Sequence, residues 1–147
     1  MIVPVFSKLL TENIKEFKKL FQNTLYILAG AGLIVLVIGW VVSPLIIGVL
    51  GGEEFVLATS VLRFLLAATL FIFVGTLLGQ TIILLGAQKK AAWAYGFGAI
   101  FNIATNLIFI PRYSYFGAAA TTVATEILVT AALLIITATV IRSRLNK

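Results

Sequence analysis

The chain contains no cysteine and no histidine among its 147 residues. Without cysteine there are no disulfides and no thiolate chemistry, and without either residue the usual zinc ligands are missing. The absence of histidine also removes the side chain that most often acts as a general base. Charged residues make up only 11% of the chain, whereas an average soluble domain has about 25%. We therefore expect no enzyme, no cofactor and no metal site.

Long apolar runs account for most of the chain, which is 61% hydrophobic. About 20 helical residues cross a hydrocarbon layer roughly 30 Å thick. Backbone polar groups in lipid must form hydrogen bonds within their own segment, so such runs insert as helices. The pattern predicts an all-α, polytopic membrane protein with four transmembrane helices in a membrane domain over 24–142, at about 24–48, 55–85, 91–110 and 117–141.

Lysine and arginine lie in alternate gaps between these runs. They precede the first run, separate the second from the third and follow the fourth, whereas the other gaps contain Glu53, Glu54 and Arg112. Cytoplasmic loops carry an excess of Lys and Arg. We therefore expect a multi-pass protein of the plasma or inner membrane with both termini cytoplasmic, including a tail at 143–147. This topology explains the net charge of +6, so the expected partner is the lipid bilayer and no nucleic acid.

Residues 1–23 are expected to form a cytoplasmic interfacial segment. Asn13 and Glu16 have the spacing of a helix-capping box. Lysines alternate with apolar residues at helical spacing after this cap, which predicts a short N-terminal amphipathic helix lying in the membrane interface. A plain juxtamembrane linker is the alternative. The apolar side of the predicted helix consists of Ile14, Phe17, Leu20 and Phe21.

Small residues and one proline indicate how the helices pack. Gly75 and Gly79 form a GxxxG spacing, which allows another helix to approach closely. We interpret it as internal packing, with a dimer interface as the alternative. Pro44 is expected to bend or end the first transmembrane helix. The other glycines expected to support tight packing are Gly30, Gly32, Gly39, Gly96 and Gly98.

Polar residues inside the runs are the candidates for function. Arg63 and Glu126 are charged, and an ionisable group in a membrane span is a functional hypothesis by default. Asn102 and Asn106 share one helix face because they are four residues apart. When residues are counted outward from the cytoplasmic end of each run, these four fall in the outer half of the bundle, where they can meet. The alternatives are a structural cluster that joins helices and a transport site.

Two stretches carry a resemblance to a known family. Residues 102–113 (NIATNLIFIPRY) and 117–126 (GAAATTVATE) resemble the signature of polysaccharide flippases, which belong to the multidrug/oligosaccharidyl-lipid/polysaccharide (MOP) flippase superfamily. Ser114 is a mild departure, because many members have glycine there. Shorter matches in the family's order extend the resemblance over nearly the whole chain, at 4–7, 16–19, 52–55, 61–63 and 84–89.

The resemblance implies a larger transporter. Such flippases have two six-helix lobes and are thought to move polyprenyl-pyrophosphate-linked sugars to the outer leaflet by alternating access. This sequence resembles the last four helices of the second lobe. The implied partners are a lipid-linked oligosaccharide and a missing N-terminal lobe or partner membrane chain. By resemblance, Arg63 would meet the pyrophosphate, and Glu126 would pair with Arg63 or serve as a proton or cation site. The alternative is a small structural or assembly membrane subunit without transport activity.

Overall fold

The structure is a computed structural model that describes residues 2–145, without the side chains of 2–4, 11, 53 and 144–145. Lys147 lies outside the described residues, as do the side chains of Pro4, Glu53 and Arg144. Within the described range, every regular element is helical, so the predicted all-helical class is confirmed. The elements are α1 (Ile2–Glu12), α2 (Ile14–Gly51), the short helix η1 (Glu53–Phe55), α3 (Val56–Leu84) and α4 (Gln88–Leu145).

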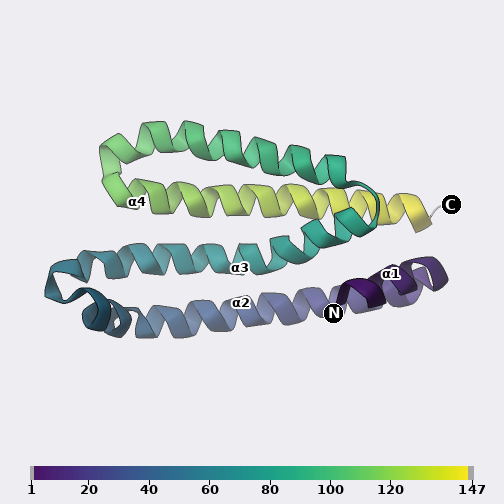
Figure 1. The fold of residues 1–147 in the computed structure, drawn as a ribbon, viewed down its shortest axis with the longest axis horizontal. Helices are drawn as coiled ribbons and strands as arrows, with labels where there is room; N and C mark the ends of the chain where they lie inside the picture. Colours follow the sequence, from purple (N-terminus) through teal and green to yellow (C-terminus); the bar gives the residue numbers. More distant parts are fainter. Residues whose placement is uncertain (1, 146–147) are drawn as a thin grey trace.

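Three of the described helices, α2, α3 and α4, are long and apolar enough to cross a membrane, rather than the four predicted. The difference lies in α4, which spans 58 residues with non-helical backbone angles at Ser114 (φ 53°, ψ −136°). Figure 1 shows that α4 folds back on itself, so that its first arm (88–113) and its second arm (115–145) run side by side. The turn occurs where the sequence separates the third and fourth apolar runs.

The first long helix starts ten residues earlier than predicted, because α2 begins at Ile14 instead of 24. Asn13 caps it by accepting hydrogen bonds from the backbone N–H groups of Lys15 and Glu16, each at 3.2 Å. The capping box is only half formed, because the Asn13 N–H donates to the carbonyl of Leu9 instead (2.8 Å). The predicted interfacial helix is therefore the first part of α2.

The apolar side of this segment faces the protein. Phe17 is fully buried, and its ring meets that of Phe6 on α1 edge to face, with centroids 5.4 Å apart. Phe21 stacks on Phe17 at 6.3 Å. Figure 1 shows α1 lying against the start of α2. α1 therefore covers the part of this apolar face around Phe17, and the position of the segment in the membrane interface stays a prediction.

The helix continues through Pro44 to Gly51 instead of ending at the proline. Figure 1 shows the last turns of α2 out of line with the rest of the helix, which agrees with the predicted bend. Gly52 ends α2 with a φ of 72°, and Gly86, with a φ of 71°, lies in the link between α3 and α4. A left-handed backbone suits glycine because no Cβ obstructs it.

Glycines bring the long helices into close contact. A Cβ added at Gly32 would lie 3.1 Å from the Cα of Leu70 on α3. Gly75 faces Thr130 on the second arm of α4, and Gly79 faces the ring of Tyr95 on the first arm. The GxxxG face of α3 thus packs inside the chain, as predicted, and both of its glycines are buried. Gly39 and Gly98 also pack closely, whereas Gly30 and Gly96 have no neighbour within 4 Å of a built Cβ, so the prediction is wrong for those two.

Large apolar side chains remain exposed along the outside of α2. Ile27, Ile34 and Val41 are 69%, 58% and 71% exposed. A soluble monomer rarely exposes a continuous apolar surface of this kind, whereas a bilayer accepts it. The chain is therefore a membrane protein by both its hydropathy and its surface.

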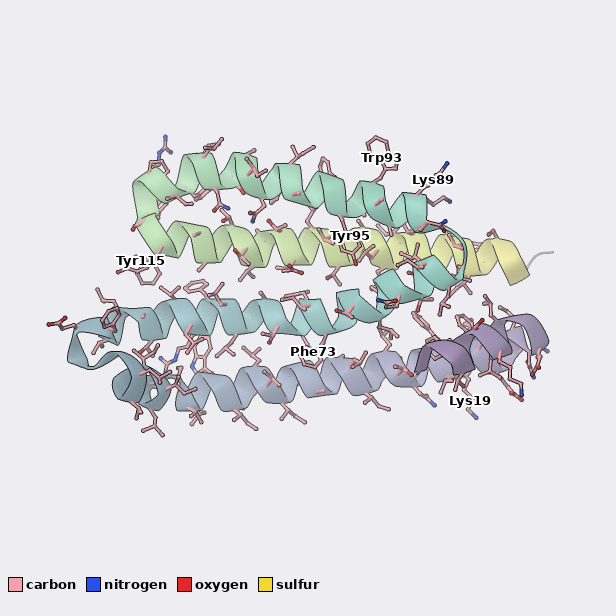
Figure 2. All side chains as sticks on the ribbon, in the orientation of Figure 1. Lys19, Phe73, Lys89, Trp93, Tyr95 and Tyr115 are labelled. Carbon is pink, nitrogen blue, oxygen red and sulfur yellow. The ribbon has the colours of Figure 1, made fainter. Side chains whose placement is uncertain are left out.

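The gaps rich in lysine and arginine lie at one end of the molecule, and the gaps between them along the chain lie at the other end. Figure 2 shows Lys19 and Lys89 at one end and Tyr115 at the other. At the basic end, Lys90 and Ser143 line one hollow, and at the opposite end Glu54 and Tyr115 line another. This arrangement agrees with alternate gaps sharing a side. Which end faces the cytoplasm stays a prediction from the Lys and Arg distribution.

We predict that the basic end is cytoplasmic. Single cysteines can be introduced into this cysteine-free chain at Glu54 and Ser114 and, at the basic end, at Gln88 and Ser143. An impermeant thiol reagent added to intact cells should label the first two and spare the others until the membrane is permeabilised. The reverse pattern would show that the basic end faces outward. Labelling of only one residue of a pair would show that the two residues of that pair lie on different sides of the membrane.

The turn of α4 provides a stability prediction. A Cβ at Gly117 would lie 2.5 Å from the carbonyl oxygen of Phe109, a backbone atom that cannot rotate away. Gly117→Ala should therefore destabilise the hairpin by about 1–3 kcal/mol, as overpacking commonly does. Gly96→Ala is the matched control, because it enters open space and gains up to about 1 kcal/mol of helix propensity. Unfolding in mixed micelles followed by circular dichroism measures both, and equal midpoints would contradict the close approach.

Candidate functional site

Arg63 on α3 is bound to α2 near the end opposite the basic gaps. Its Nε donates to the carbonyl oxygen of Trp40 (3.2 Å) and to the hydroxyl of Ser43 (3.0 Å). The guanidinium carbon lies 5.2 Å from the centroid of the Trp40 ring, a cation–π geometry. Ser43 is fully buried. The charge is thus oriented by a backbone carbonyl, a hydroxyl and an aromatic face.

Pro44 explains why this site exists. In an α-helix the carbonyl of residue 40 accepts a hydrogen bond from the N–H of residue 44, but proline has no N–H. The freed carbonyl of Trp40 instead accepts from Ser43 Oγ at 2.9 Å and from Arg63 Nε. An unpaired carbonyl in an apolar environment is costly. The missing N–H of Pro44 therefore favours the hydrogen bond from Arg63 to the Trp40 carbonyl.

A cavity of about 300 Å³ opens beside Arg63. Only the Nε of this side chain bonds within the described part of the chain, so the two terminal nitrogens keep their donors. A guanidinium fork with free donors matches phosphate and carboxylate oxygens. The site can therefore bind an oxyanion next to aromatic side chains. The cavity is lined by Trp40, Ser60, Arg63, Phe64 and Ala67.

Asn102 and Asn106 form a separate cluster between the two arms of α4. Asn106 Nδ2 donates to Asn102 Oδ1 (2.9 Å), and Asn102 Nδ2 donates to Thr125 Oγ1 (3.0 Å). The Thr121 hydroxyl donates to Asn106 Oδ1. The cluster holds the hairpin together, because each asparagine on the first arm bonds a threonine on the second. The structure brings these two predicted residues together and places Arg63 against α2 instead.

Glu126 follows this cluster on the second arm and is half-buried. Within the described part of the chain, its carboxylate makes no hydrogen bond or ion pair, and its electrostatic neighbour is Tyr95 on the first arm. No hydrogen bond or ion pair joins it to Arg63 or Asn102 among these residues: Arg63 bonds to α2 through its Nε, and Asn102 bonds the neighbouring Thr125. Among residues 2–145, no three carboxylate, histidine or cysteine side chains are grouped so that they could hold a metal ion.

Sequence reasoning missed Trp40, Ser43, Thr121 and Thr125. Two signals could have found them. Pro44 identifies the carbonyl four residues earlier as unpaired, and that residue is Trp40. Thr121 and Thr125 repeat, on the fourth run, the spacing of four that Asn102 and Asn106 have on the third.

We predict that Pro44 and Arg63 are energetically coupled. Pro44→Ala supplies the missing N–H, so Arg63→Ala should cost about 1 kcal/mol less in that background, the typical net value of one hydrogen bond. A double-mutant cycle of unfolding free energies in micelles measures the difference. Arg112→Ala, an exposed arginine at the turn of α4, is the control that should add independently to Pro44→Ala. Additivity of Arg63 and Pro44 within about 0.3 kcal/mol would contradict the coupling.

Comparison with known proteins places the chain in a family. The MatE family model matches residues 11–108, which include α2, α3 and most of the first arm of α4. No curated protein and no solved structure matches the chain. MatE proteins are transporters rather than enzymes, within the superfamily that the sequence resembles. Since the match extends over about two thirds of the chain, the protein belongs to the MatE family of membrane transporters.

Proposed function

We propose that this chain forms part of a polysaccharide-type flippase that moves polyprenyl-pyrophosphate-linked sugars across the membrane. Membership of the MatE family supports transport. The resemblance of residues 102–126 to polysaccharide flippases favours a lipid-linked oligosaccharide over other cargo. The observation that carries the proposal is Arg63, whose free guanidinium donors face an aromatic-lined cavity.

In this proposal Arg63 binds the pyrophosphate. Its Nε is held by the Trp40 carbonyl and Ser43, so the remaining donors are aimed rather than free to rotate. A fixed fork binds a phosphate oxygen pair at a lower entropic cost than a flexible ammonium would. Trp40 and Phe64 present apolar surface beside the charge, which suits a ligand that joins a charged group to a sugar or an isoprenoid.

Glu126, Asn102 and Asn106 are proposed as the polar wall of the transport cavity. Both asparagines are committed to the hairpin, so they would shape the cavity more than bind the cargo. Glu126 has no partner within the described residues and is the proposed proton or cation site. Alternating access needs a second lobe that moves against this one, and a first-lobe polypeptide is therefore the proposed protein partner.

A structural role is the second candidate. The cluster of Asn102, Asn106, Thr121 and Thr125 is satisfied internally, which a helix-joining subunit needs and a binding site does not. In that role the chain would assemble with another membrane protein in the plasma or inner membrane, with both termini cytoplasmic, and carry no cargo.

Reconstitution distinguishes the two candidates. Liposomes receive a fluorescent polyprenyl-pyrophosphate sugar and the chain, alone or with a first-lobe polypeptide, and headgroup accessibility is followed from outside. We expect no flipping by residues 1–147 alone, because four helices that resemble most of one lobe supply at most one wall of the cavity, and flipping when both polypeptides are present. Arg63→Ala should lower the flipping rate by at least tenfold, because a hydrogen bond to a charged group contributes about 1.5–3 kcal/mol.

Arg112→Ala is the matched control, because Arg112 is an exposed arginine that lies outside the cavity lined by Arg63. It should leave the flipping rate unchanged. Flipping by the chain alone that Arg63→Ala abolishes would make it a self-sufficient transporter. A stable complex with the first lobe but without flipping would favour the structural role.

A further inference from the structure

A groove of about 340 Å³ opens at the basic end of the molecule, away from the Arg63 cavity. Its floor is Leu78 of α3, which is buried. One wall comes from the first turns of α2, and the other comes from the end of the second arm of α4. The lining residues that matter here are Lys18, Gln22, Leu25, Leu134, Ala138 and Arg142.

The groove has a polar end and an apolar body. α2 runs away from the basic end, while the second arm of α4 returns to it (Figure 1). Lys18 stands near the start of α2 and Arg142 near the end of α4, and both line the groove. Further from the basic end along the two helices, Leu25 lines the groove from α2 and Leu134 lines it from α4. The hydroxyl of Thr137 is occupied by the Leu133 carbonyl at 2.8 Å. Apart from the amide of Gln22, the body of the groove therefore offers a ligand mainly apolar surface.

Both cations at the rim are unpaired within the described part of the chain. Lys18 and Arg142 are exposed and make no ion pair or hydrogen bond there. Among the described residues, no carboxylate lines the groove itself. Two unpaired cations above an apolar slot complement a molecule that has a negative headgroup and a hydrocarbon tail. Basic pockets between transmembrane helices bind phosphate headgroups of anionic lipids in this way.

We propose that this groove is a binding site for an anionic phospholipid of the surrounding bilayer. One acyl chain lies along Leu25, Leu78 and Leu134, and the phosphate is held between Lys18 and Arg142. A bilayer lipid is favoured over the isoprenoid carrier because the rim cations are exposed and form no bond within the described residues, whereas Arg63, the proposed pyrophosphate ligand, is fixed by two hydrogen bonds. The bound lipid would brace α2 against the second arm of α4 across the top of α3.

Native mass spectrometry of the full chain, released from micelles, tests this site. Phosphatidylglycerol and phosphatidylcholine with identical acyl chains are titrated separately, and the bound fraction is measured. We expect the anionic lipid to bind more tightly. The variant Lys18→Gln/Arg142→Gln should weaken phosphatidylglycerol binding by about 25-fold, since each basic side chain near an anionic surface contributes roughly fivefold. Phosphatidylcholine should lose less, because its choline offsets the charge of its phosphate.

Two further variants test whether lipid binding depends on the groove itself or only on positive charge at this end of the molecule. Lys19→Gln/Lys89→Gln removes the same charge at the same end (Figure 2) but outside the groove, so it should change binding less than twofold. Ala138→Met fills the groove and keeps both cations, so it should weaken both lipids. Circular dichroism confirms that each variant is folded, and Ala138→Val replaces the methionine variant if that one unfolds.

Four outcomes would overturn the proposal. Equal losses in the two charge variants would reduce the effect to surface charge. Full lipid binding by the folded groove-filling variant would place the lipid elsewhere. Displacement of phosphatidylglycerol by equimolar farnesyl pyrophosphate would assign the groove to the isoprenoid carrier. Loss of self-association in Ala138→Met with lipid binding intact would make the groove a protein interface. None of these readouts depends on flipping, so the site stands or falls independently of the proposed transport function.

Discussion

The arrangement depends on one constraint, which is that a backbone polar group inside a bilayer has no water with which to bond. Continuous helices satisfy it everywhere except where the chain removes a donor or breaks the helix. Pro44 removes the donor for the Trp40 carbonyl, and the replacements are Ser43 and Arg63. A charged side chain is therefore drawn to a fixed point on the neighbouring helix. The candidate site therefore exists because Arg63 and Ser43 donate to a carbonyl that lost its helical partner.

The same constraint governs the hydroxyl groups that these apolar helices contain. Many threonines donate to a carbonyl three or four residues earlier in their own helix, which satisfies the hydroxyl without a partner helix. Thr125 does so at 2.7 Å and still accepts from Asn102. Hydroxyls paired in this way leave methyl groups to pack, so the long helices approach one another through glycine and threonine. The threonines with such a bond to the fourth preceding residue are Thr24, Thr76, Thr105, Thr122, Thr125 and Thr137.

Cationic side chains occur at both ends of the molecule, but they differ in burial and in hydrogen bonding. Arg63 is half-buried and anchored, so its remaining donors have a defined direction. Lys18 and Arg142 are exposed at the rim of a groove, and each keeps the rotational freedom of a long side chain. An anchored guanidinium favours selective binding of one geometry, whereas exposed cations without a fixed partner suit exchange with many similar lipids. The two ends thus suit different phosphate-bearing partners.

The sequence by itself determined the helical class, the apolar runs, the alternation of basic gaps and the turn near Ser114. Each of these depends on residues close together in the chain, because hydropathy and backbone preference are local. It also led to Asn102 and Asn106 as neighbours, because a spacing of four places them on one helix face. It placed the start of the first long helix at 24, ten residues late. Hydropathy detects lipid-facing residues, so it separated the amphipathic segment after the Asn13 cap from the apolar run with which it forms one helix.

Only the tertiary structure decided which polar residues meet. The sequence allowed Arg63 to join Asn102 and Glu126, since all three lie in the same half of the apolar runs. The rotation of each helix about its axis is set by close contacts such as Gly32 against Leu70 and Gly75 against Thr130. Those contacts direct Arg63 towards α2 and leave the asparagines to the hairpin. Position along each helix was therefore readable from the local sequence, whereas direction around the helix was fixed by packing between distant segments.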